Sequence, residues 1–414
     1  MIGHAAMPRA SEVATRFRAF SCTRAAAEAA QTRVGDAAIV RTFEFAGLVV
    51  RVVLCGQPLL SVMLPAVAHA ESSPERAAGR AATPDLTIVA WDARATGVGL
   101  PPAFCGEEAI GLRGEIASLS DERFHAAYFT QARLLCHYDA EDRLAFLGVV
   151  DATRLAAFER TNPFRAILGW FLRRHGRMLV HAAAVATPDG AVVFGGRSGA
   201  GKSTTAIRCL LAGLDYLGDD ICCLSCDPVD GPFVHGMFSS GKTHRRDWAT
   251  LPELEQFAEP RHHAADKEHY FLARRFAAQL PLSRPVRAVV IPDHSTGRLG
   301  FEPVAAAEAI APIAASTTAL LTSAGSEILT GLGAIVRRVP CYRFHLGTDP
   351  TRIPAAVADF LAARATDASQ RAARCTPRRG MSFTSLSNSR LAGRVGPRCR
   401  SPGNRRRSAA IATR

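Results

Sequence analysis

The segment Ala191–Leu211, AVVFGGRSGAGKSTTAIRCLL, decides what kind of fold this chain adopts. Its first four residues are apolar and predict a buried strand, and the residues from Ser203 onward predict a helix. Gly213 follows the last apolar position and is placed to end that helix. Between these two elements, Gly196–Ser203 reads GRSGAGKS and matches G-x-x-x-x-G-K-[ST], the phosphate-binding P-loop.

The loop has the chemistry that nucleotide phosphates require. Its glycines let the backbone turn sharply and direct several N–H groups at one anion, and the following helix adds the positive end of its dipole. We expect Lys202 to reach the outer phosphates and the Ser203 hydroxyl to complete a Mg²⁺ shell, so a nucleotide and Mg²⁺ are the predicted ligands. The residues predicted to bind the nucleotide are Gly196, Arg197, Ser198, Gly199, Ala200, Gly201, Lys202, Ser203 and Thr204.

Two further features flank the loop. Downstream, Asp219 and Asp220 stand directly before the apolar run Ile221–Leu224, and successive side chains on a strand point to opposite faces. The two acids therefore suit two tasks: binding Mg²⁺ and accepting the proton of an attacking hydroxyl. Upstream, the turn Pro188–Gly190 separates the P-loop strand from the apolar run that contains His181. This spacing predicts a hairpin that returns His181 to the mouth of the loop.

Together, His181, the hairpin, GRSGAGKSTTA and the Asp219–Asp220 pair resemble the catalytic domain of HPr kinase/phosphorylase. They resemble more closely the related kinases that are encoded with peptide-maturation systems, including those of lasso peptides. The resemblance covers residues 162–364 and implies a P-loop fold similar to the nucleotide-binding part of phosphoenolpyruvate carboxykinase.

The resemblance also implies an activity, which is ATP-dependent phosphorylation of a serine hydroxyl on a peptide or small protein. By motif position, Asp219 would be the general base, and His181 a helper near the transferred phosphoryl group that Lys202 also contacts. Asp220 would be a magnesium ligand alongside Ser203. A small-molecule kinase, or a nucleotide-dependent regulatory module without transfer chemistry, remains an alternative reading of the same motifs.

The sequence departs from HPr kinase/phosphorylase downstream of the two acids. The glutamate and the arginine- and glycine-rich signature of that family are absent, and residues 234–247 read VHGMFSSGKTHRRD instead. Neither phosphorylase activity nor HPr as the substrate is therefore expected. Ser240–Lys242 resembles a short element of the peptide-maturation relatives, which makes Lys242 the predicted substrate contact.

The formal charge of +13 is concentrated at one end of the chain. From Thr366 to Arg414 there are twelve arginines and one acid, which give this segment +11 and leave +2 for the rest. The body is nearly neutral, so we expect no basic groove and no specific nucleic-acid partner. The segment is poor in apolar residues, and we expect it to be a disordered, solvated tail; Arg405–Arg407 could instead contact RNA, anionic lipid or an acidic peptide.

The sequence predicts an α/β protein with four parts. These are an N-terminal extension (1–40), a small β-rich domain of unknown role (41–150), the P-loop kinase domain (160–365) and the basic tail (366–414). Strands are expected at 43–53, 85–91, 112–116, 126–129, 144–149, 178–185, 286–291 and 341–346, and helices at 305–315, 325–337 and 350–364. A further helix is expected to begin at Asn162, with its side chain as the cap.

Two alternatives concern cysteines and export. Cys223 and Cys226 form a C-x-x-C pair with no second pair nearby, so buried apolar cysteines are expected rather than a zinc site. The apolar stretch 45–70 ends AVAHA, as a signal-peptidase site does, but Arg51 and Gln57 interrupt it. No membrane span is expected, and we predict a cytoplasmic protein; a monomer and a homo-oligomer both remain open.

Overall fold

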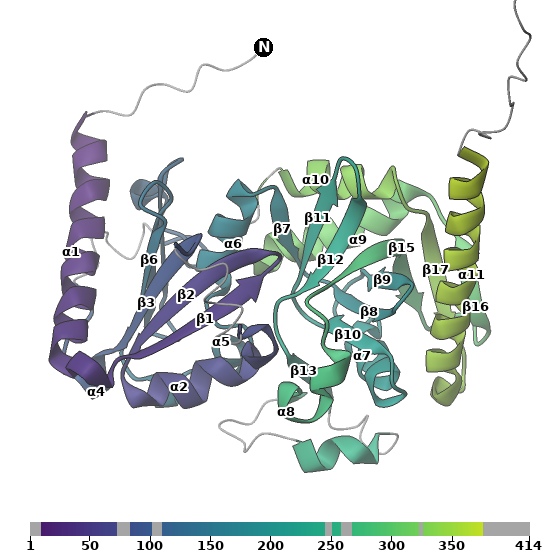
Figure 1. Ribbon diagram of the computed structural model, residues 1–414, viewed down its shortest axis with the longest axis horizontal. Helices are drawn as coiled ribbons and strands as arrows, with labels where there is room; N and C mark the ends of the chain where they lie inside the picture. Colours follow the sequence, from purple (N-terminus) through teal and green to yellow (C-terminus); the bar gives the residue numbers. More distant parts are fainter. Residues whose placement is uncertain are drawn as a thin grey trace, which may run out of the picture. The chain divides into compact units, whose positions relative to one another are not determined.

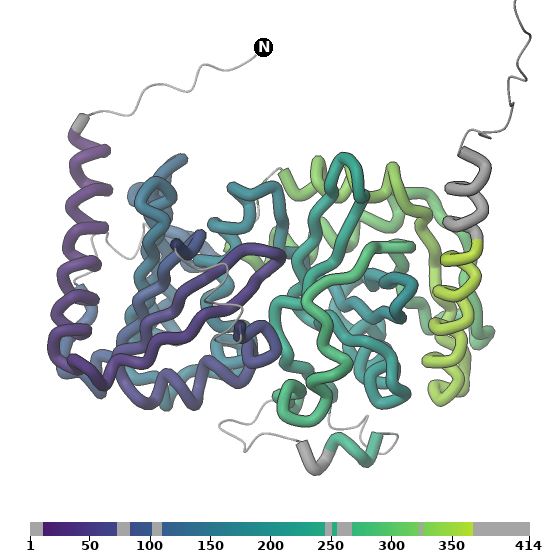
Figure 2. Tube along the Cα trace, in the orientation of Figure 1, coloured from purple at the N-terminus to yellow at the C-terminus, as the bar shows by residue number. Residues whose placement is uncertain are grey.

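The computed structural model describes residues 10–72, 83–101, 110–244, 251–257, 267–322, 325 and 327–375. Within this part of the chain, two large sheets form the centres of two domains that belong to one compact unit. The tube trace separates them by colour, with the purple and blue residues around the first sheet and the teal to yellow residues around the second (Figure 2).

The N-terminal domain is a six-stranded mixed sheet covered by helices on both faces (Figure 1). Its strands are β1 (Ile39–Phe45), β2 (Leu48–Cys55), β3 (Leu86–Asp92), β4 (Phe124–Phe129), β5 (Leu134–Asp139) and β6 (Leu144–Val149), in spatial order β1-β2-β3-β6-β5-β4. Its helices are α1 (Ala10–Val34), α2 (Gln57–Met63) and α4 (Ala93–Thr96). Phe20, Ala27 and Ala30 of α1 are buried against the sheet, so the predicted extension is an integral layer of this domain.

The second domain is built on a nine-stranded sheet with the core order β10-β8-β9-β15-β12-β11-β7. Its strands are β7 (Arg177–Val180), β8 (Ala183–Thr187), β9 (Gly190–Phe194), β10 (Asp215–Gly218), β11 (Cys222–Asp227), β12 (Gly231–Gly236), β15 (Ser283–Asp293), β16 (Leu299–Pro303) and β17 (Cys341–Leu346). A separate ribbon pairs β13 (Ser240–His244) with β14 (Lys267–Phe271). The helices are α5 (Ala157–Thr161) and α6 (Arg165–Arg174) before the sheet, then α7 (Lys202–Leu211), α8 (Ala273–Phe276), α9 (Ala306–Leu320), α10 (Glu327–Val336) and α11 (Ile353–Cys375).

Strand alternation explains why helices cover both faces of this sheet. On β9, Val192 and Phe194 point into the core shared with α7 and α11, whereas Ala191 and Val193 point into the core shared with α9 and α10. A strand that is buried on both faces has an uninterrupted apolar sequence, and Ala191–Phe194 is such a sequence.

Three strands of this sheet are parallel and end at the same edge. β15 pairs in parallel with β9 on one side and with β17 on the other. The loops that follow these strands begin at Gly195, His294 and Gly347. Ligands of open α/β sheets bind outside the carboxyl ends of such strands, so this edge is where a site is expected.

The two domains share one apolar core. Trp170 and Phe171 of α6 are buried together with strand residues of the N-terminal sheet. Met237 and Phe238, which follow β12, belong to the same cluster. The two domains therefore pack against each other through apolar residues.

Several expected elements differ in the structure. The single strand predicted at 43–53 is the hairpin of β1 and β2, because Ala46 and Gly47 adopt positive φ of 51° and 79° and reverse the chain. Residues 112–116 form no strand of their own and make only isolated bridges, at Glu115 and Ile116. Strands β5, β10, β12 and β16 and the ribbon of β13 and β14 were not anticipated.

Two boundaries in the second domain also differ. Asn162 does not cap α6, because its side chain donates to Phe158 O in the preceding turn and the helix begins at Arg165. The run predicted at 178–185 is split into β7 and β8, and His181 lies at the break. The hairpin of β8 and β9 is as predicted.

The remaining expectations concern the cysteines, the tail and the membrane. Cys223 is buried on β11 as expected, whereas Cys226 on the same strand is only partly buried; among the described residues no cluster of metal ligands forms. α11 continues to Cys375, past the predicted start of the tail, and residues 376–414 lie outside the described part. No helix in the described ranges is both long and apolar enough to cross a bilayer.

Candidate active site

The glycine-rich loop joins the end of β9 to the start of α7. Gly201 immediately precedes the helix with a φ of 93°, a conformation that L side chains rarely adopt. A Cβ atom there would also lie 2.8 Å from His294 Nε2, so the loop backbone passes close to the segment after β15. The first N–H groups of a helix have no partner within it, so the start of α7 offers donors to an anion held by the loop.

Lys202 is the first residue of α7 and is only 5% exposed. Its Nζ donates to the loop carbonyls of Gly196 at 2.9 Å and Arg197 at 3.2 Å. Burial lowers the pKa of Lys202 to about 8, although the nearby carboxylates of Asp220 and Asp219 act in the opposite direction. The ammonium group thus lies inside the loop, held by carbonyls that a phosphate could replace as its partner.

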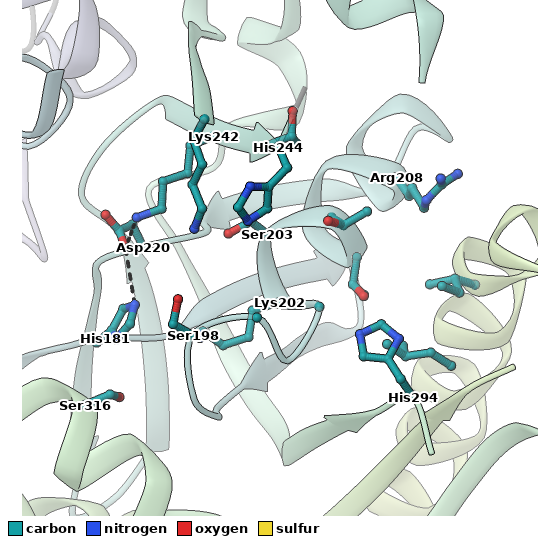
Figure 3. A pocket seen from close by; sticks show the side chains of 18 of the residues that line it. His181, Ser198, Lys202, Ser203, Arg208, Asp220, Lys242, His244, His294 and Ser316 are labelled. Carbon is teal, nitrogen blue, oxygen red and sulfur yellow. Dashed lines mark ion pairs between the residues drawn. The ribbon is translucent and has the colours of Figure 1, made fainter. Parts of the chain in front are cut away.

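A cavity of about 650 Å³ opens beside the loop. Its wall is formed by His181, Ser198, Gly199, Gly201, Lys202, Ser203, Thr204, Thr205, Arg208, Asp220, Lys242, Thr243, His244, Lys267, His294, Ser316, Ala319, Leu320, Leu346, Gly347, Pro350 and Ile353. Figure 3 shows Lys202 and Ser203 on the loop side, with the cluster of Asp220, Lys242 and His181 beside them. The volume lies in the range of ordinary ligand pockets.

The two adjacent acids lie in the bend between β10 and β11 and have different partners. Asp219 is buried, and its Oδ2 accepts a hydrogen bond from Lys242 N at 3.0 Å. The Ser203 hydroxyl lies 3.4 Å from Asp219 O and also close to the Asp219 carboxylate, and it can donate its one hydrogen to either. Burial raises the pKa of Asp219 to about 6, and the charge of Lys242 only partly offsets this. Asp219 therefore lies next to Ser203 and does not line the cavity.

Asp220 faces the cavity instead. Its Oδ1 lies 2.6 Å from Lys242 Nζ and 3.2 Å from His181 Nε2 (Figure 3). Burial opposes ionisation of Asp220, but the hydrogen bond with His181 and the charge of Lys242 outweigh it and hold the pKa well below its usual range. Asp220 is thus a carboxylate at neutral pH, and it is within reach of a ligand in the cavity.

Fixed backbone contacts hold the partners of Asp220. His181 lies between β7 and β8, and its N–H donates to Thr317 Oγ1 of α9 at 2.9 Å. Lys242 is carried by β13, whose Ser240 O accepts a hydrogen bond from the Tyr216 hydroxyl at 2.7 Å. Both contacts join segments that are distant in the sequence, so the cluster depends on the whole domain.

The cavity wall is predominantly cationic. Among the described residues that line it, Lys202, Arg208, Lys242 and Lys267 are cations, whereas Asp220 is the acid. Such a surface attracts a highly charged anion and is consistent with a polyphosphate ligand.

The structure brings most of the predicted residues to one cavity. His181, Ser198, Gly199, Gly201, Lys202, Ser203, Thr204, Asp220 and Lys242 line it, whereas Gly196, Arg197, Ala200 and Asp219 belong to the same region but do not contribute to the wall.

Sequence reasoning missed the residues that come from the other strand ends and from α9. His294 follows β15, Leu346 and Gly347 stand at the end of β17, and Ser316 lies on α9. A usable signal existed for the first three, because the strands at 286–291 and 341–346 were anticipated and parallel strands end at one edge. No local pattern marks Ser316.

Comparison with protein-family models finds no match, and neither does comparison with curated proteins. Among solved structures, the chain is similar to the HPr(Ser) kinase/phosphatase from Coxiella burnetii. The two share 10% sequence identity over 47% of this chain and 97% of that chain, with a TM-score of 0.28.

Proposed function

We propose that this protein is a Mg-ATP-dependent kinase that phosphorylates a serine hydroxyl of a peptide or small protein. One observation carries the proposal: the glycine-rich loop with Lys202 and the cluster of Asp220, Lys242 and His181 line the same cavity. A module that only binds nucleotide needs the loop alone. A transferase also needs a group that accepts the proton of the attacking hydroxyl and cations that neutralise the developing charge.

Lys202 and the loop amides would bind the phosphates. On binding, the Lys202 ammonium would exchange its contacts with Gly196 O and Arg197 O for oxygens of the outer phosphates. Its lowered pKa, about 8, reflects burial without a phosphate partner, so an anion at this point would favour the charged form.

The residues around Ser203 fit a magnesium ion. Mg²⁺ is commonly held by one or two protein oxygens, with phosphates and waters completing its shell. The Ser203 hydroxyl and the Asp219 carboxylate are two such oxygens in hydrogen-bond contact. A bound Mg²⁺ would neutralise phosphate charge, and it would also offset the burial that raises the pKa of Asp219.

This geometry favours an exchange of the roles that motif position suggested for the two acids. Asp219 lies next to Ser203 and away from the cavity, which suits the metal side. Asp220 lines the cavity, where the hydroxyl of an acceptor could reach its carboxylate, and this position suits proton acceptance. We therefore propose Asp220 as the proton acceptor, Asp219 as the magnesium ligand, and His181 as the residue that orients Asp220.

In the proposed reaction the acceptor oxygen bonds to the γ-phosphorus and its proton passes to Asp220. The bond between the γ-phosphorus and the bridging oxygen of ATP breaks, and ADP leaves. Lys242, at 2.6 Å from Asp220, holds the carboxylate in its charged form and lies beside the incoming acceptor.

The direct test is phosphoryl transfer from γ-labelled ATP with the full chain. Serine-containing peptides and small hydroxyl compounds are supplied as separate acceptor panels, with and without Mg²⁺. We expect Mg²⁺-dependent label in serine peptides and none in the Lys202→Met protein. Tight ATP binding without transfer to any acceptor would favour a binding module, and label confined to the small compounds would favour a small-molecule kinase.

A further inference from the structure

A loop of the N-terminal domain makes a specific contact with the end of α9. The Arg113 guanidinium donates through Nε and Nη2 to Glu115 Oε1 at 3.2 and 2.9 Å. Glu115 itself forms an isolated bridge with Ala127 of β4. One side of the guanidinium is thus fixed to the N-terminal sheet.

The other side of the guanidinium binds main-chain oxygens at the end of α9. Arg113 Nη1 donates to Thr318 O at 2.8 Å and to Leu321 O at 2.9 Å. In return, the Thr322 hydroxyl donates to Arg113 O at 2.8 Å. The last carbonyls of a helix have no partner within it, and a cation there also interacts favourably with the helix dipole.

The same turns of α9 form part of the candidate active site. Ser316, Ala319 and Leu320 line the cavity, and Figure 3 shows Ser316 on the same side as His181. Between them in sequence, Thr317 is fully buried and its hydroxyl accepts the His181 N–H at 2.9 Å. His181 in turn lies 3.2 Å from Asp220.

We infer that Arg113 is a positioning residue for phosphoryl transfer, acting through α9 on His181 and Asp220. The inference rests on the proposed function for its effect on rate. A helical turn moves as a unit, so a displaced end of α9 would shift both Thr317 and the cavity wall. Misplacing a reacting group by about 1 Å can cost on the order of a hundredfold in rate. Arg113 does not line the cavity, and the end of α9 lies on the side opposite the glycine-rich loop, so we expect nucleotide binding to change little.

The alternative is that Arg113 only holds the two domains together. In that case its loss would lower thermal stability without changing His181 specifically. The readouts must therefore separate a general loss of stability from a local change at the site, and at least one of them must be independent of catalysis.

The test compares wild type with Arg113→Ala, Arg113→Lys and Thr322→Val. We expect Arg113→Ala to lower kcat about tenfold or more while the Kd for ATP stays within about twofold. Hydrogen–deuterium exchange should accelerate at the His181 amide and in residues 316–321, because the hydrogen bond to Thr317 loosens. Arg113→Lys, which keeps a cation at the helix end, should recover part of kcat.

Arg338→Ala is the matched control. Arg338 also donates two hydrogen bonds to main-chain oxygens, those of Asp227 and Pro228, but it does not line the cavity. We expect this variant to retain wild-type kcat and wild-type exchange at His181.

Wild-type kcat and wild-type exchange at His181 in Arg113→Ala would overturn the inference. If Arg113→Ala does not fold, Thr322→Val decides: faster exchange at His181 supports the inference, and unchanged exchange overturns it. If the wild-type protein binds ATP but transfers nothing, the proposed function fails. The exchange measurements would still decide whether Arg113 positions His181.

Discussion

The two sides of the cavity are built in different ways. The loop side comes from one contiguous stretch, Gly196–Thr204, between a strand and a helix that are adjacent in the sequence. The opposite side is assembled from His181, Asp220, Lys242 and the last turns of α9. The first and last of these are more than a hundred residues apart in the sequence. The loop side depends on local backbone geometry, and the opposite side on tertiary packing.

This difference predicts how the two sides respond to mutation. A change in the loop should remove phosphate binding directly, whereas a change on the assembled side should leave binding intact and alter transfer or the position of a partner.

Lys202→Met should abolish transfer and weaken ATP binding together. The substitution keeps an apolar stem but removes the cation at the outer phosphates, and we expect a loss in kcat/KM of roughly a thousandfold. Calorimetry with ATP and the transfer assay measure the two effects. A folded Lys202→Met protein with unchanged affinity and turnover would contradict the nucleotide-binding role of the loop.

Asp220→Asn should reduce transfer by about a hundredfold or more while the Kd for ATP changes little, because an amide cannot accept the proton. Added Mg²⁺ should not restore the activity. Asp215→Asn is the matched control, since Asp215 also pairs with a cation, Arg284 at 2.7 Å, but does not line the cavity. Recovery of Asp220→Asn at high Mg²⁺ would instead support the motif-based assignment of Asp220 to the metal.

Asp219→Asn should stabilise the metal-free protein near pH 7. Burial raises the pKa of Asp219 to about 6, so the folded state holds this proton more tightly than the unfolded chain does. Ionisation of Asp219 therefore costs stability as the pH rises from about 4 to above 6, by roughly 1–3 kcal/mol. Asn avoids that cost, and the gain in stability should disappear as the pH falls towards 4.

Thermal unfolding of wild type and Asp219→Asn between pH 4 and pH 8 measures this effect. Mg²⁺ with ATP should stabilise wild type more than Asp219→Asn if Asp219 binds the metal. Equal stabilisation of the two proteins, with transfer lost only in Asp219→Asn, would return the general-base role to Asp219.

Tyr216→Phe should give the smallest effect. It removes the buried hydrogen bond to Ser240 O, which holds the strand that carries Lys242, at a cost of about 1–2 kcal/mol in stability. We expect a fall in kcat of only a few fold, measured beside the denaturation midpoint. A loss as large as that of Asp220→Asn would mean that the Tyr216 hydroxyl takes part in the chemistry.

Much of the second domain could be anticipated because its signals are local. The apolar run before Gly195, the glycine at 213 and the turn at 188–190 each specify backbone geometry over a few residues. The strands of the N-terminal domain were harder to predict from the sequence. Its first hairpin turns at Ala46–Gly47 inside a continuous apolar stretch, which gives no polar punctuation to separate two strands.

By itself, the sequence determined that this chain is an α/β protein with a glycine-rich, P-loop-like turn between a buried strand and a helix. It determined this because the residues concerned are neighbours whose conformations are set by glycine, by apolar periodicity and by helix capping. Tertiary structure alone decided that Asp219 lies next to Ser203 while Asp220 meets His181 and Lys242, and that Arg113 reaches the end of α9. Those contacts join segments whose approach depends on how two sheets and their helices pack, and no local pattern encodes that packing.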